Sequence, residues 1–111
     1  MAIEVYLANS INNDIAKTIS LPCYPKTLAT ILDEIDTDTC HEYVILETKC
    51  FIEGVSSCIN KNTSLAELNE AAFLLQQLSP NSFGKVSAFI SDRASNMTSL
   101  LLYLQSLFSE L

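Results

Sequence analysis

Five side chains in this sequence have the chemistry of metal ligands or of a nucleophile with its base: Cys23, Cys40, His41, Cys50 and Cys58. Common zinc sites pair their ligands roughly two to four residues apart, and these five residues do not follow that spacing. No known catalytic motif surrounds any cysteine, and the adjacent side chains of Cys40 and His41 diverge in extended chain. We therefore predict four reduced cysteines acting mostly as small buried hydrophobic residues, with no catalytic residue, metal or cofactor.

Carboxylates are the other groups that could carry a function. The chain has 13 Asp and Glu residues against 6 Lys and Arg, and its net charge is −7. A basic face for nucleic acid or for anionic lipid is not expected, because both need clustered cations. The densest stretch, residues 33–42, holds five carboxylates and no Lys or Arg. This stretch is either a solvated surface or a surface for a basic partner. Asp33, Asp36 and Asp38 lack the glycine and the terminal Glu of a calcium-binding loop.

The pattern of apolar residues changes near residue 62. Before this point, residues 3–7 alternate and are β-branched or aromatic at key positions, which predicts a strand. We expect two further strands, at residues 16–21, where Pro22 stops the strand, and at residues 43–48. Pro25 suits the first turn of a helix that continues to Ile35. The continuous apolar start of the third strand predicts burial on both of its sides there.

Beyond residue 62 the pattern is wholly helical. Ser64, followed three residues later by Glu67, forms a capping box ahead of one helix, and Thr63 is a competing cap one position earlier. A second helix starts near Pro80, and either Asn96 or Thr98 caps the last one. The apolar residues of the last helix cover more than one face, so this helix is either central in the bundle or meets another chain.

These elements predict an α+β fold. A small antiparallel three-stranded sheet with one helix (residues 1–62) precedes a small bundle of about three helices (residues 63–111). A chain of 111 residues is one domain, or two very small ones that share a core. The longest apolar runs have five residues, whereas a bilayer span needs about 20, and no secretory signal is visible. We expect no membrane attachment and a cytoplasmic location.

Three segments of the chain resemble ArdA-type antirestriction proteins. Residues 3–9 (IEVYLAN) are similar to the opening strand of that family, residues 42–47 (EYVILE) to its tyrosine-containing third strand, and residues 64–69 (SLAELN) to the following helix. Their order and spacing agree with the family, and Leu21-Pro22 fits the end of the second strand. The similarity covers residues 3–93.

The resemblance implies a protein of mobile genetic elements, conjugative transposons and phages. Such proteins are elongated acidic dimers that imitate bent B-form DNA and occupy the DNA groove of type I restriction-modification enzymes. Surface carboxylates stand in for phosphates, so neither covalent chemistry nor direct binding of nucleic acid is needed. No segment of residues 1–111 resembles the further domain that carries the family's dimer contact. The phosphate mimics, expected along one continuous ridge, would be Asp33, Glu34, Asp36, Asp38, Glu42, Glu47, Glu67 and Glu70.

Two other functions compete with mimicry. The chain would alternatively be a protein–protein interaction module of a mobile element that acts through its apolar carboxy-terminal helix. A homodimer built on the excess apolar surface of that helix would use Leu101, Tyr103 and Phe108. A small enzyme using His41 and a cysteine is the third reading, and it predicts a lowered cysteine pKa near His41.

Overall fold

Three strands form one antiparallel sheet. The computed structural model describes residues 3–37, 40–52, 54–92 and 96–109. The strands lie in the order β2-β1-β3, with bounds β1 (Ile3–Asn9), β2 (Ala16–Leu21) and β3 (Tyr43–Cys50). A short 3-10 helix, η1 (Val55–Cys58), follows β3. The sheet of the predicted α+β fold is thereby confirmed.

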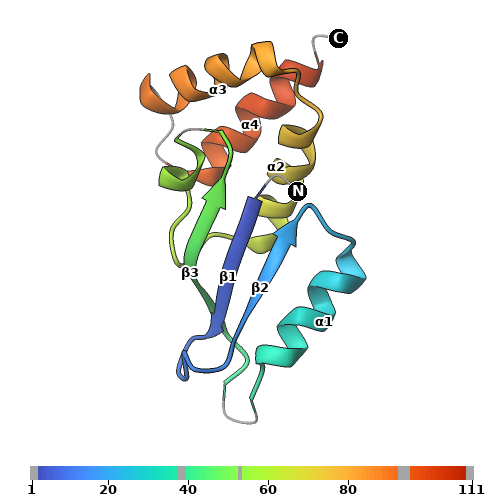
Figure 1. The fold of residues 1–111 in the computed structure, drawn as a ribbon, viewed down its shortest axis with the longest axis vertical. Coiled ribbons are helices and arrows are strands. Elements are labelled where there is room, and N and C mark those ends of the chain that lie inside the picture. Colours follow the sequence, from blue (N-terminus) through green and yellow to red (C-terminus); the bar gives the residue numbers. More distant parts are fainter. Residues whose placement is uncertain (1–2, 38–39, 53, 93–95, 110–111) are drawn as a thin grey trace.

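The described residues also form four α-helices, in the order α1 (Pro25–Ile35), α2 (Leu65–Gln76), α3 (Pro80–Asp92) and α4 (Met97–Ser109). In Figure 1, α2, α3 and α4 gather toward one end of the sheet, whereas α1 lies beside β2 toward the other end. The molecule is elongated, with extents of 46 × 26 × 19 Å. The end of α1 and the beginning of β3 lie toward one tip of the long axis (Figure 1).

The sheet has one apolar and one polar face. Ile3 and Val5 of β1 are fully buried, whereas Tyr6 is exposed and lies opposite Thr18 and Glu47. A register shift between Tyr6 and Leu7 leaves Leu46 of β3 without a partner on β1, and Leu46 is 44% exposed. The expectation that the start of β3 is buried on both sides is therefore wrong at Leu46, because the bulge turns that side chain outward.

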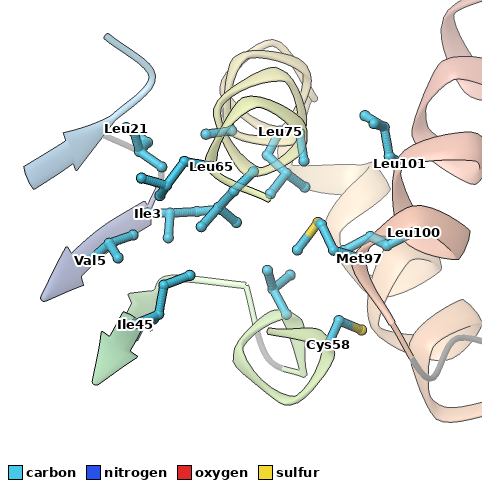
Figure 2. Close-up of a cluster of buried hydrophobic side chains, with 14 of the residues drawn as sticks. Ile3, Val5, Leu21, Ile45, Cys58, Leu65, Leu75, Met97, Leu100 and Leu101 are labelled. Carbon is cyan, nitrogen blue, oxygen red and sulfur yellow. The ribbon is translucent and has the colours of Figure 1, made fainter. Parts of the chain in front are cut away.

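A single cluster of buried side chains joins the strand-rich and helical parts. Figure 2 shows side chains of all three strands pointing toward η1, α2 and α4. The labelled members of the cluster are Ile3, Val5, Leu21, Ile45, Cys58, Leu65, Leu75, Met97, Leu100 and Leu101. The change of pattern near residue 62 thus separates two kinds of secondary structure that share one core.

Side-chain caps fix where two of the helices begin. Ser64 Oγ accepts the amide hydrogen of Glu67 at 3.4 Å, which confirms the predicted start of α2. Asn96 Oδ1 accepts the amide hydrogen of Ser99 at 2.9 Å, so Asn96 and not Thr98 caps α4. Gly54 precedes η1 with a φ of 92°, a conformation that favours glycine.

Asn69 of α2 makes two hydrogen bonds to the backbone of the segment that connects β2 and α1. Its Oδ1 accepts the amide hydrogen of Cys23 at 2.9 Å, and its Nδ2 donates to the Cys23 carbonyl at 2.9 Å.

We expect Asn69→Ala to lower the free energy of unfolding by roughly 2 kcal/mol, because two part-buried backbone groups lose their partner. Urea denaturation measures this loss. Gln77→Ala is the matched control, since that amide makes one exposed 3.4 Å bond to Phe73. Equal losses of unfolding free energy in Asn69→Ala and Gln77→Ala would contradict a stabilising role of the Asn69 hydrogen bonds.

Candidate partner-binding surfaces

Four exposed carboxylates surround the junction between α1 and β3. Asp33 and Glu34 lie in the last turn of α1, Asp36 follows that helix, and Glu42 precedes β3. We call these four residues the acidic end, since the end of α1 and the beginning of β3 lie toward one tip of the molecule (Figure 1). The last turn of α1 contains no basic residue. Carboxylates oppose the helix dipole at this position, so helix stability does not account for them.

A buried asparagine holds both sides of the acidic end in place. Asn9 at the end of β1 is fully buried, and its Nδ2 donates to the carbonyls of Ile35 at 3.0 Å and Cys40 at 3.1 Å. Its Oδ1 accepts the amide hydrogens of Ile11 at 3.0 Å and Asn12 at 3.1 Å. The sequence pattern indicated Asn9 only as part of a strand motif, because its partners lie up to 31 residues away.

Two carboxylates of the acidic end have charged or titratable partners. Lys17 Nζ lies 3.5 Å from Glu34 Oε2, and both side chains are about half exposed, so solvent screens this pair. His41 Nδ1 lies 2.6 Å from Asp36 Oδ1. Within the described part of the chain, no ion pair engages Asp33 or Glu42. These two carboxylates therefore remain open to a partner.

The other predicted phosphate mimics lie elsewhere. Glu47 projects from the polar face of the sheet, where it lines a shallow hollow of ≈ 240 Å³ with Glu4, Tyr6 and Lys49. Glu67 and Glu70 lie on α2, and Asp38 falls outside the described residues. The described carboxylates thus occupy three separate places. The expected single ridge is not formed, because helix and strand geometry turns these side chains in different directions.

Glu67 and Glu70 connect α2 to α4. Thr98 Oγ1 donates to Glu67 Oε2 at 3.1 Å, and Gln105 Nε2 donates to Glu70 Oε1 at 3.0 Å. The Glu67 carboxylate lies in the first turn of α2 and contacts the first turn of α4, where a negative charge is favourable. These two residues therefore have a structural role that does not depend on phosphate mimicry.

The residues expected to form a dimer are largely occupied within the chain. Leu101 is only 6% exposed and belongs to the core. Tyr103 stacks on Phe89 of α3, with ring centroids 4.0 Å apart and planes within 4°. Phe108 is half-buried. The apolar excess of α4 is therefore mainly explained by its central position, and its exposed apolar residue is Leu102.

The four cysteines are free, and two of them, Cys40 and Cys58, are buried. Burial raises the pKa of Cys23, Cys50 and Cys58. A hydrogen bond with Ser10, at 3.1 Å between Oγ and Sγ, lowers the pKa of the Cys40 thiol. The pKa of Cys40 is therefore lowered by the hydrogen bond with Ser10 and not by the adjacent His41, whose ring nitrogen contacts Asp36.

The described residues contain no group of three or more His, Cys, Asp and Glu side chains placed to hold a metal ion. None of the described helices has both the length and the hydropathy that a bilayer span requires. Comparisons of the chain with protein-family models, curated proteins and solved structures found no match. Membership of the antirestriction family therefore stays a prediction from the three similar segments.

Proposed function

We propose that this chain is a non-enzymatic antirestriction protein whose acidic end binds in the DNA groove of type I restriction-modification enzymes. The main support is the exposed position of Asp33 and Glu42 at a tip of the molecule, where no described ion pair neutralises them. Negative side chains in such a place attract the Lys and Arg residues that line a DNA groove. The choice of a type I restriction-modification enzyme as the partner rests on the resemblance of residues 3–9, 42–47 and 64–69 to antirestriction proteins.

The amount of charge limits how much DNA the chain could replace. A duplex as long as the molecule, 46 Å, carries about 27 phosphate charges at one per 1.7 Å. The net charge of the chain is −7, about a quarter of that number. The proposed mimicry is therefore local: the acidic end competes for a short part of the groove.

Competition for DNA tests this proposal. A purified type I restriction enzyme is bound to labelled DNA, and the chain is titrated in at two salt concentrations. We expect the Asp33→Asn/Glu42→Gln variant to need about tenfold more protein for half displacement, because roughly 1.4 kcal/mol of attraction is lost. Added salt should weaken displacement by the unchanged chain.

A second double variant provides the control. Glu67→Gln/Glu70→Gln removes the same two charges from α2, and each new amide oxygen can still accept the bond from α4. We expect this variant to displace DNA as well as the unchanged chain does. Equal displacement by both double variants, or no displacement by the unchanged chain at low salt, would contradict the proposal.

A further inference from the structure

Helices α2 and α4 each expose one large apolar side chain. Phe73 of α2 is 55% exposed and Leu102 of α4 is 63% exposed. Leu102 lies four residues after Thr98 and three before Gln105, and both of these residues hydrogen-bond to α2. Residues at these spacings share one face of a helix, so Leu102 lies along the outer side of the contact.

Phe73 extends the same surface on α2. It lies three residues after Glu70, which accepts the hydrogen bond from Gln105. We call this surface the α2–α4 seam, and its members are Glu67, Glu70, Phe73, Thr98, Leu102 and Gln105. It combines exposed apolar groups with carboxylates, which is the composition of a small interface with a polar rim.

The charged residues of the seam itself are all negative, and the neighbouring Lys61 lines a hollow together with Glu67 and Thr98. Helix α4 contains no charged residue, and the charged residues of α2 are Glu67 and Glu70. The donors that these carboxylates receive from α4 are a neutral hydroxyl and a neutral amide, so both negative charges remain uncompensated by α4. A partner with positive charge beside apolar side chains would complement both features.

A second copy of this chain fits the seam poorly. A two-fold contact places the same surface on both sides, so Glu67 and Glu70 would meet their own copies. Each chain also carries a net charge of −7. Like charges facing each other across an interface oppose association. Charge therefore favours a different, basic occupant.

We propose that the α2–α4 seam is a docking surface for a basic amphipathic segment of another protein. The apolar side of that segment would cover Phe73 and Leu102, and its Lys or Arg residues would lie against Glu67 and Glu70. This surface is separate from the acidic end, which lies at the other end of the molecule (Figure 1). The inference is thus independent of the proposed antirestriction function.

A synthetic peptide tests the docking surface. The probe has about 18 residues, five helical turns, with Leu on one face and Lys on the other, and one control has the same composition in scrambled order. Binding is followed by fluorescence anisotropy, and the contact is located from amide chemical shifts. We expect shifts in α2 and α4, and about tenfold weaker binding by Phe73→Ser/Leu102→Ser.

Ile11→Ser is the matched variant, since Ile11 is 74% exposed in the turn after β1, far from the helical end (Figure 1). It should bind the peptide unchanged, and melting curves should show all the variants folded. The inference is overturned by equal binding of the scrambled peptide, or by shifts confined to the acidic end. Dimers of the unchanged chain that Phe73→Ser/Leu102→Ser abolishes would also overturn it, in favour of a second copy.

Discussion

Replacing Asn9 by Asp is expected to lower the free energy of unfolding by about 3 kcal/mol or more. The change is nearly isosteric, but it removes the two hydrogens that Nδ2 donates to the carbonyls of Ile35 and Cys40. A negative oxygen would then face two carbonyl oxygens in a fully buried place. Chemical denaturation monitored by circular dichroism measures the loss.

Asn12→Asp is the control for this variant. Asn12 is exposed, and its side chain acts as an acceptor, from the amide of Asp14 at 3.2 Å, so a carboxylate can replace it. We expect Asn12→Asp to change stability by about 0.5 kcal/mol or less. Because Asn9 fixes both sides of the acidic end, Asn9→Asp should also increase amide exchange at Ile35 and Cys40. Losses of equal size for the two variants would show that the buried network is not what stabilises the junction.

Replacing Leu100 by Ala is expected to cost roughly 2–5 kcal/mol, because the side chain is fully buried and its removal leaves a cavity in the core. The loss of stability should extend from the helices to the sheet. Leu100 belongs to the same cluster as Ile3, Val5 and Leu21 of the sheet (Figure 2). We expect one cooperative unfolding transition, with amide protection falling in β1 and β2 as well as in α2 and α4.

Leu102→Ala on the same helix separates this core effect from the change in helix propensity that any Leu-to-Ala substitution makes. Leu102 is mostly exposed, so its replacement should cost about 0.5 kcal/mol or less. Two separate transitions in Leu100→Ala, with the strands still protected after the helices unfold, would contradict a shared core.

The elements of the fold were predictable because their signals are local. Strand β2 was predicted with its observed bounds (Ala16–Leu21) because Pro22 stops it, and Pro25 and Ser64 marked the beginnings of α1 and α2. The choice between Asn96 and Thr98 as a cap stayed open, since both side chains can accept an amide hydrogen. The outward position of Leu46 depends on a bulge against β1, which the pattern of one strand does not reveal.

The surfaces were less predictable, for two physical reasons. The run Leu100–Leu104 is apolar at every position, so the side of α4 that faces solvent is marked only by polar residues outside the run, such as Thr98 and Gln105. Leu101 was therefore expected at the surface and lies in the core, while Leu102 is exposed. Asn9 and Asn69 bond to backbone groups far away in the chain, and residue spacing contains no information about such contacts.

The contribution of α4 to the shared core affects how the chain can fold during its synthesis. The three strands are translated before α2, but Met97, Leu100 and Leu104, which complete the cluster around the sheet, are translated after α1, α2 and α3. Until they emerge from the ribosome, apolar side chains of β1 and β2 have no complete cover. Folding of the nascent chain should therefore be late and cooperative, and chaperones that bind exposed apolar strands should act before α4 appears.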